Sequence, residues 1–582
     1  MRHAIRITPF ALVGSLACTA AAPSPPSTLA PDQGRRVVAR NGVVTSAHPL
    51  ASEAGLAMLQ QGGNAIDAAV AAAFAIGVVE PQMSGVGGGG ALLAWFQGQR
   101  RAEFLDFYAA QPAATFRAAR ALGRDSTTPL RIVGVPGLTA GLLEAHARYG
   151  RLARERVLAP AIRIAEEGFP VYQVLGEFIA RDSVRLTRDP VARALFFPGG
   201  RPLGGGEMLR NPDLAAVLRR IAEAGRAGFY EGEAARALVA RMNAGGHPVT
   251  MADLAAYQPT WRRPLCTDYR GRVVLSAPPP EGGMQVLHTL ELMERHDLAA
   301  LGLPTTSARA FDVMTSAMRV GQLGARASDD PRWAAVPARG VVSADFAAGW
   351  SNAVGTGRAA DSLRPRDARP FDQAVAAACN AFEPWTSAAP AVSSPREDDG
   401  SLGGETTHIS VVDRDGNAVA VTVTNSSGFG AGVVVQGFLL NDSGFLFRAA
   451  DFANDQAPAW RTRTTTIAPT ILLRNGSPEL VVGSPGGGRI PLAMAQVISY
   501  VVDYGLDPLE AIRMPRIYPA AANRRVELEN GFPPEILAAA RGMGYLPVPQ
   551  GFGYARLYVI ARRGDRWIGA ADPRHDGQAR GY

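Results

Sequence analysis

The spacing of hydrophobic residues predicts helices in the first half of the chain. Residues 51–61 read as a helix closed by a pair of glycines. Asn64 suits the N-cap of a second, alanine-rich helix that ends near Val79. Residues 136–260 are mostly amphipathic helix, with individual helices stopped by glycine.

A glycine-rich loop at 80–90 leads from these helices to a strand-like stretch at 91–96. Its letters include Gly85-x-Gly87-x-x-Gly90, which matches a dinucleotide-binding fingerprint. That fingerprint lies between a strand and a helix, whereas here the helix precedes and the strand follows. We therefore interpret the loop as a close approach of backbone to another segment, and no cofactor is predicted.

Runs of β-branched residues predict two hairpins in the last third of the chain. The first joins 406–413 to 418–425 through an Asp-Gly turn, and the second joins 470–474 to 479–483 through an Asn-Gly turn. Helices before and after hairpins, without βαβ units, indicate an α+β fold with largely antiparallel sheets.

The segment just before the first hairpin differs in composition. Residues 386–405 are rich in Ser, Ala, Pro, Gly and acidic residues and have no apolar periodicity. We expect an exposed, flexible linker there.

Composition and charge exclude several classes of protein. Of the 582 residues, 47% are hydrophobic and 19% are charged, which excludes a disordered or collagenous chain. The net charge is +7, from 59 arginines against 52 acidic residues, and the chain has no lysine. The arginines occur singly or in pairs along the chain. Because no basic stripe results, nucleic acid is not an expected partner.

Residues 1–30 have the three parts of an export signal, which are a basic start, an apolar stretch and a run of small residues. Cleavage near Ala22 gives a signal peptide of 1–22, and Cys18 is an alternative site for a lipid anchor. We expect an exported protein, periplasmic or secreted, that is either free or lipid-anchored. The later apolar stretch 65–79 is too short to span a membrane and suits a buried helix.

Few residues suit a disulfide framework or a metal. Beyond the signal only Cys266 and Cys379 remain, and they can pair although nothing in the sequence requires it. The eight histidines are scattered, without an HExxH motif or a ligand pair at helical spacing. No metal is therefore predicted.

Thr406 stands at the start of a predicted strand, directly after the linker. If the bond between Glu405 and Thr406 is cut, Thr406 gains a free α-amine, whose ordinary pKa is about 7.7–8.0. That amine can accept the proton of the Thr406 hydroxyl, so one residue supplies both nucleophile and base. An ordinary strand threonine is the competing interpretation.

A glycine pair near the end of the second hairpin offers a complementary function. Gly486 and Gly487 lie after a strand and before an apolar helix. Their two backbone N–H groups can point at a developing oxyanion, although such a pair is also common in simple turns.

Several segments resemble the γ-glutamyltransferase family of self-processing N-terminal nucleophile hydrolases. They follow the family's order and cover nearly all of the chain after the signal. The matching segments are GGNAIDAAVAAAFAIGVVEPQMSGVGGGG (62–90), GVPGLTAGLLEAHARYGRLARERVLAPAIRIAEEGFPV (134–171), GFYEGEAARALVARM (228–242), TTHISVVDRDGNAVAVT (406–422), SPGGGRIP (484–491) and DPRHDGQARGY (572–582).

The resemblance implies a four-layer αββα sandwich built from one precursor. A large chain, 33–405, would end in the linker, and a small catalytic chain, 406–582, would follow the cut between Glu405 and Thr406. The site residues that it implies are Thr406 as nucleophile, Thr424 as the hydroxyl that orients it, and Gly486 and Gly487 as the oxyanion hole.

The acyl pocket departs from the family pattern. Tyr108 stands where a carboxylate-binding arginine is expected. Ser426 stands where Asn is usual, and the alternative is that a local shift brings the adjacent Asn425 into that place. Ser443 and Leu446 occupy the places of a Gln and an Asp that hold the amino group.

The hydroxyl pair Thr465-Thr466, which also meets the carboxylate, is retained. Each lost charge-assisted hydrogen bond weakens binding roughly ten- to a hundredfold, which would make glutathione a poor substrate. Alternatively, a neighbour such as Arg117 or Arg120 supplies the missing cation.

We therefore expect an amidohydrolase in which Thr406 takes the acyl group of an amide, such as a γ-glutamyl compound, and passes it to water or an amine. One alternative is an acylase with altered acyl specificity, of the glutaryl or cephalosporin type. Another is an uncut, non-catalytic binding protein of the same fold. The expected partners are a small-molecule amide, an acceptor amine or water, and the two chains of one precursor.

Overall fold

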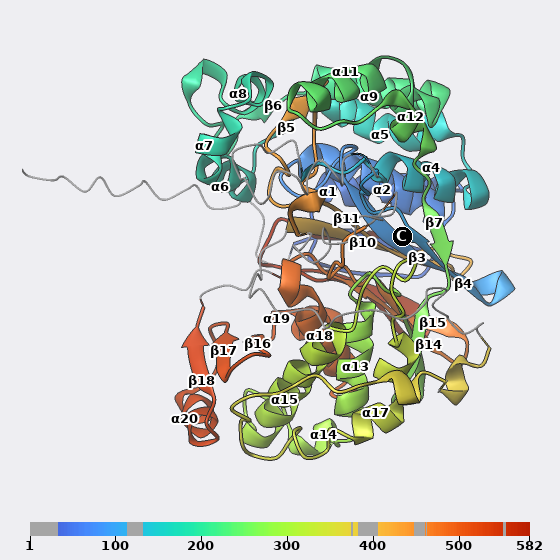
Figure 1. Cartoon of the computed structure of the whole chain (residues 1–582). Helices are drawn as coiled ribbons and strands as arrows, with labels where there is room; N and C mark the ends of the chain where they lie inside the picture. The colour runs from blue at the N-terminus through green and yellow to red at the C-terminus, as the bar shows by residue number, and fades with distance from the viewer. Residues whose placement is uncertain are drawn as a thin grey trace, which may run out of the picture.

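Two facing antiparallel sheets, each of seven strands, form the middle of the molecule, and helices cover the outer face of each sheet (Figure 1). The computed structural model describes residues 33–112, 114, 132–373, 376–381, 405–446, 460, 462–550 and 555–582. The predicted αββα order is confirmed.

The first sheet carries both arms of the first predicted hairpin. In spatial order its strands are β21 (Gln578–Gly581), β2 (Val43–Ser46), β10 (Glu405–Val412), β11 (Ala418–Ser426), β3 (Gly89–Phe96), β4 (Arg101–Asp106) and β7 (Thr260–Arg262). Along β11, Val421 and Val423 pack against the helices while Ala418 and Ala420 face the other sheet. Both faces are buried, which explains why the strand sequence lacks a polar side.

The second sheet contains the second predicted hairpin. Its strands, in spatial order, are β1 (Arg36–Ala39), β20 (Arg566–Ala571), β19 (Tyr558–Arg563), β15 (Ser477–Gly483), β14 (Thr470–Arg474), β9 (Arg272–Ser276) and β8 (Leu265–Tyr269). Leu93, Ile471, Val481 and Ile560 belong to the apolar layer between the sheets. In both sheets, strands that follow Thr406 in sequence lie directly beside strands that precede it.

Helices form the two outer layers. On the first sheet lie α1 (Pro49–Gln60), α2 (Ala65–Val79) and α4 (Leu138–Tyr149), followed outward by α5 (Arg154–Glu167), α9 (Pro212–Ala224), α11 (Gly232–Ala244) and α12 (Met251–Ala256) (Figure 1). On the second lie α13 (Gly283–Glu294), α18 (Ile490–Val502) and α19 (Pro508–Arg513), and α15 (Ala308–Ala325) packs outside α13, with α14 (Leu298–Leu301), α17 (Ala344–Ala348) and α20 (Pro534–Gly542) nearby (Figure 1). As predicted, the Asn64 side chain caps α2 by accepting hydrogen bonds from the N–H groups of Ile66 and Asp67.

Smaller elements complete the described chain. The short helices are α6 (Gln173–Arg181), α7 (Ser183–Leu186), α8 (Pro190–Phe196), α10 (Ala227–Tyr230) and α16 (Ala338–Val341), and the short strands are β5 (Phe169–Pro170), β6 (Met208–Leu209), β12 (Val434–Val435), β13 (Phe438–Leu439), β16 (Ile517–Pro519), β17 (Arg525–Leu528) and β18 (Leu546–Pro549).

The glycine-rich loop makes the close approach that its sequence predicts. A Cβ at Gly88 would lie 2.4 Å from the carbonyl oxygen of Thr424, and one at Gly87 would lie 2.0 Å from that of Leu439. No larger residue fits in either place. The loop therefore fixes the end of β11, where Thr424 lies.

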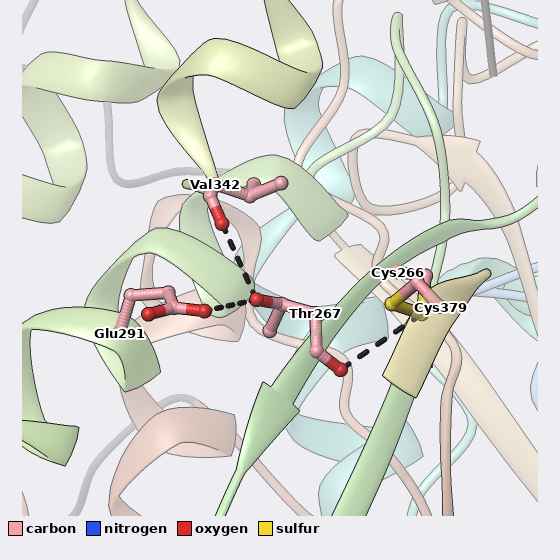
Figure 2. The surroundings of a disulfide bond; sticks show 5 residues. All are labelled: Cys266, Thr267, Glu291, Val342 and Cys379. Atoms are coloured by element: carbon pink, nitrogen blue, oxygen red, sulfur yellow. Dashed lines mark hydrogen bonds between the residues drawn. A yellow bond between two sulfur atoms is a disulfide. The ribbon is translucent and has the colours of Figure 1, made fainter. Parts of the chain in front are cut away.

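Cys266 of β8 and Cys379 form a disulfide (Figure 2), which settles a pairing that the sequence left open. Beside it Thr267 Oγ1 contacts the Glu291 carboxylate and lies 3.2 Å from the Val342 carbonyl oxygen. Burial raises the pKa of Glu291 to about 7. The disulfide fixes the chain close to the start of the predicted linker.

Some predictions fall outside the described residues, namely the signal peptide 1–22 with Cys18, the linker 386–404, Arg117 and Arg120. Glu405, the last residue of that linker, lies in β10 instead of an exposed loop. Within the described ranges, no helix is both long and apolar enough to cross a membrane.

Candidate active site

Thr406 is the second residue of β10 and is only 4% exposed. The register between β10 and β11 shifts around it, because Glu405 pairs with Ser426 while Thr407 pairs with Val423. Two residues of β11 therefore lie opposite Thr406, as in a β-bulge. This irregularity brings the Thr424 side chain to the junction between Glu405 and Thr406.

The Thr424 hydroxyl connects the predicted nucleophile to the bond that would be cut. The Thr406 hydroxyl lies 3.5 Å from Thr424 Oγ1, and Thr424 donates a hydrogen bond to the carbonyl oxygen of Glu405. Thr424 Oγ1 also accepts the backbone N–H of Ser426 at 2.8 Å. A hydroxyl has one proton and two lone pairs, so these contacts occupy Thr424 fully and fix its orientation.

Two arginines hold the Glu405 side chain. Arg556 lies 3.6 Å and Arg181 lies 4.0 Å from its carboxylate oxygens. Burial raises the pKa of Glu405, although both arginines oppose that shift. The residue before the junction is therefore held in place by its side chain as well as by β10.

Arg556 belongs to a buried polar chain that sequence analysis missed. Its guanidinium contacts His575 Nε2 at 2.6 Å, and His575 Nδ1 lies 3.8 Å from Glu80. Burial and the neighbouring Arg556 charge lower the pKa of His575 well below its usual value, so the ring is neutral and Nε2 accepts from Arg556. Burial also raises the pKa of Glu80 to about 7.

The glycine pair precedes α18, as the sequence predicts. Gly486 has φ of 131°, and a Cβ there would lie 2.7 Å from the Cα of Ala555, so only glycine fits. Gly487 opens the short helix η8 (Gly487–Arg489), which continues into α18. Exposed N–H groups at such a helix start carry partial positive charge.

The loop that carries Gly486 and Gly487 is connected to strand β10 through two neighbouring residues. Arg556, which holds Glu405, donates its backbone N–H to the Pro485 carbonyl oxygen at 3.4 Å. Gly483, at the end of β15, passes so close to His408 of β10 that a Cβ would lie 2.1 Å from the His408 ring. These contacts set the loop beside the start of β10.

The side chains of Tyr108, Ser426 and Ser443 meet at the end of β11, two residues beyond Thr424. Ser426 Oγ lies 3.1 Å from the Tyr108 hydroxyl and 3.0 Å from Ser443 Oγ. All three side chains are at least 95% buried. Asn441 holds the Ser443 backbone through a hydrogen bond of 3.1 Å to its N–H. Leu446 ends the short helix η6 (Ser443–Leu446), which places its backbone next to this group.

Arg463 completes this group, and sequence analysis missed it. Its Nη2 and Nε donate hydrogen bonds to the Tyr108 hydroxyl at 2.7 and 3.1 Å. A cation thus lies beside the tyrosine that replaces the expected arginine. The sequence suggests Arg117 or Arg120 for this place, but the cation is Arg463, from a different segment. The sequence signal was its position two residues before Thr465.

The Thr465-Thr466 pair lies between the group formed by Tyr108 and Arg463 and the loop that carries Gly486 and Gly487. Thr466 donates a hydrogen bond to the Gly487 carbonyl oxygen at 2.8 Å. Thr465 Oγ1 accepts the Ile467 N–H at 3.3 Å, and the Thr465 N–H donates to the Pro280 carbonyl oxygen at 3.0 Å. The segment therefore touches the predicted oxyanion hole at one end and Tyr108 at the other.

Replacing Thr424 by valine should slow cleavage of the chain at Glu405. The substitution keeps the branched shape but removes the donor to the Glu405 carbonyl, and loss of one such donor costs roughly 10²- to 10³-fold in rate. The cut fraction should be followed over time on a denaturing gel. Thr424→Ser keeps the hydroxyl and should still cut, whereas cutting of the valine variant at the wild-type rate would contradict this role.

Comparisons with known proteins agree with the geometry. The family model described as Gamma-glutamyltranspeptidase matches residues 51–582. The glutathione hydrolase proenzyme of Bacillus subtilis (strain 168) is 31% identical over 98% of this chain and 96% of its own length. The Acylase ACY 1 proenzyme of Pseudomonas sp. (strain V22) is 32% identical over 92% of each chain.

Among solved structures, the crystal structure of cephalosporin acylase from Bacillus halodurans superimposes with a TM-score of 0.82 and 29% identity. That superposition covers 96% of this chain and 99% of the other. Sequence and structure therefore agree over almost the whole length. The chain belongs to the gamma-glutamyltranspeptidase family.

Proposed function

We propose that this protein is an amidohydrolase with Thr406 as its nucleophile. Thr406 first cleaves the peptide bond between Glu405 and itself. The observation that carries the proposal is the contact chain from Thr406 through Thr424 to the Glu405 carbonyl. It couples the attacking hydroxyl to the carbonyl that it would attack.

The first step is an acyl shift within the precursor. Thr406 Oγ1 bonds to the carbonyl carbon of Glu405 while Thr424 donates to the carbonyl oxygen, where negative charge develops. The bond from that carbon to the Thr406 nitrogen then breaks, and the hydroxyl proton moves to the nitrogen. Water hydrolyses the resulting ester, which releases the Glu405 carboxyl group and restores the Thr406 hydroxyl beside a free amine.

In the cut protein the new amine serves as the base. It takes the hydroxyl proton as Thr406 attacks a substrate amide, and the N–H groups of Gly486 and Gly487 would stabilise the oxyanion. The proton passes to the leaving amine, and an acyl ester remains on Thr406. Water or an acceptor amine then takes the acyl group.

The proposed substrates are small amides with a short acyl group, either γ-glutamyl compounds or related acyl amides. Two relatives are named as a glutathione hydrolase and an acylase, which supports both kinds of acyl group. The buried hydroxyls of Tyr108, Ser426 and Ser443 would line the acyl site.

Mass spectrometry of the purified protein tests the first step. We expect two chains, the smaller with Thr406 as its first residue and running to Tyr582. Turnover of an acyl p-nitroanilide should appear only in samples that contain both chains. Active protein with an uncut bond at this junction would have no α-amine at Thr406 and would contradict the mechanism.

We also propose that the protein is exported. The disulfide between Cys266 and Cys379 supports this proposal, because disulfides persist in oxidising compartments and are rare in the reducing cytosol (Figure 2). The signal-like composition of residues 1–30 is consistent with it. Cell fractionation with an antibody to the purified protein would test the location.

A further inference from the structure

We propose that Arg463, positioned by Tyr108, binds a carboxylate at the far end of the acyl group. The substrates would then be amides of short dicarboxylic acids, such as glutaryl amides. This inference rests on the proposed function of Thr406, but it concerns a different part of the site and can fail separately.

The hydrogen bonds of Tyr108 fix where the Arg463 charge lies. Arg463 donates two N–H groups to the Tyr108 hydroxyl oxygen, at 2.7 and 3.1 Å. That oxygen has two lone pairs, so its own proton is left for Ser426 Oγ at 3.1 Å. Tyr108 itself is 1% exposed, so its ring is packed on all sides. The guanidinium is thus held beside Ser426, which follows Thr424 on β11 by two residues.

The charge of Arg463 has no counter-ion in the part of the chain that the structure describes. No described carboxylate lies within 4 Å of its guanidinium. Asp442 is near enough for the Arg463 charge to act on its pKa, but burial dominates and raises that pKa, and its Oδ1 accepts the Ser427 N–H at 2.8 Å. A half-buried guanidinium with spare donors is suited to a carboxylate, which it can bind in a bidentate manner.

The position of Arg463 along the chain places its backbone near the predicted oxyanion hole. Thr466, three positions after Arg463, donates its hydroxyl to the Gly487 carbonyl oxygen. Three positions of chain span at most about 11 Å between Cα atoms. This proximity is what a short acyl group held at both ends requires.

The same pocket offers little to an α-ammonium group. Ser426 and Ser443 are neutral and already hydrogen-bonded to each other at 3.0 Å. The nearby carboxylate, Asp442, is 4% exposed and already accepts a hydrogen bond. An ammonium beside Arg463 would also meet a like charge. A diacid acyl group, with a carboxylate and no amine, fits these features better than a glutamyl group.

The test compares p-nitroanilides of glutaryl, γ-glutamyl and pentanoyl groups, which share one chain length. Wild-type protein should turn over the glutaryl compound with the lowest KM. Arg463→Gln should raise that KM roughly ten- to a hundredfold while kcat changes little, because the lost contact is far from the reacting carbonyl. Arg463→Lys should recover only part of the loss, since lysine lacks the planar fork.

A matched control is Arg474→Gln, which removes the same charge from an exposed residue at the end of β14. It should keep the wild-type preference for glutaryl over pentanoyl. Calorimetry on cut protein should show glutarate binding more tightly than pentanoate, and Arg463→Gln should abolish the difference.

Three results would overturn the inference: equal KM for glutaryl and pentanoyl compounds, preference for the γ-glutamyl compound, or an unchanged glutaryl KM in Arg463→Gln. An uncut protein that hydrolyses none of the three compounds contradicts the proposed function instead. In that case the uncut chain should be titrated with glutarate and with pentanoate. Tighter binding of glutarate would support the role of Arg463, and equal binding of the two would overturn it.

Discussion

Replacing Thr406 by valine should leave one uncut chain without detectable amidase activity. Valine keeps the branched shape that suits β10, so the fold should persist while the hydroxyl is lost. The same change removes the attacking atom of both self-cleavage and catalysis. Loss of a covalent nucleophile costs on the order of 10⁶ in kcat in a serine protease, and we expect a comparable loss here. A denaturing gel and p-nitroanilide turnover measure the two effects.

Thr45→Val is the matched control. Thr45 is fully buried in β2 of the same sheet, and its hydroxyl has no hydrogen-bond partner among the residues described. This variant should be cut and active like wild type. Thr406→Ser should regain cutting, because it restores a hydroxyl at the same place. Cutting of Thr406→Val would show that another residue performs the attack.

Asp572→Ala should destabilise the fold by about 3–5 kcal/mol, because it leaves a buried arginine without its counter-ion. Asp572 and Arg516 are both fully buried, with Oδ2 and Nη2 2.6 Å apart. Asp572 also accepts the Leu557 N–H at 3.0 Å. Urea unfolding should be compared in a Thr406→Val background, so that every sample is a single chain.

The pH dependence of this difference follows from the Asp572 pKa. Burial alone would raise that pKa, but Arg516 and Arg574 more than offset burial, and the folded-state pKa is lower than usual. The contribution of ionised Asp572 to the free energy of unfolding is therefore complete above the unfolded-state pKa of about 3.9. It is lost as the pH falls through the folded-state pKa. The difference in free energy of unfolding between the parent and Asp572→Ala should decrease below about pH 4.

Asp565→Ala controls for loss of an aspartate as such. Asp565 pairs with Arg40 at 3.3 Å, and both side chains are more than 60% exposed. Such surface pairs contribute at most about 1 kcal/mol. If Asp572→Ala cost no more than Asp565→Ala, the buried pair would not stabilise the fold.

Local pattern was sufficient to predict much of the fold. Both hairpins form where β-branched runs flank Asp-Gly and Asn-Gly turns, and α2 begins at the Asn64 cap. These signals depend on residues close in sequence. The glycine run at 80–90 was also interpretable, because a series of residues without side chains implies tight packing.

Contacts between distant segments were not predictable in the same way. Arg463 and Tyr108 are 355 positions apart in sequence, and the position of Arg463 two residues before Thr465 does not by itself indicate a contact with Tyr108. The chain from Glu405 through Arg556 to His575 likewise depends on how β10 and the C-terminal segment meet. Family resemblance identified the positions that depart from the common pattern, but only the fold shows which side chain compensates.

The strand order bears on how the two chains would stay together after the proposed cut. Strands β10 and β11, which follow the cut, lie between β2 and β3, which precede it, and β14 pairs with β9. The disulfide would not join the two chains, since both cysteines precede the cut. In the part of the chain that the structure describes, backbone pairing, a shared apolar interior and ion pairs such as that between Arg272 and Glu479 would hold them. Their separation would expose sheet edges and apolar faces, so we expect dissociation and unfolding to occur together.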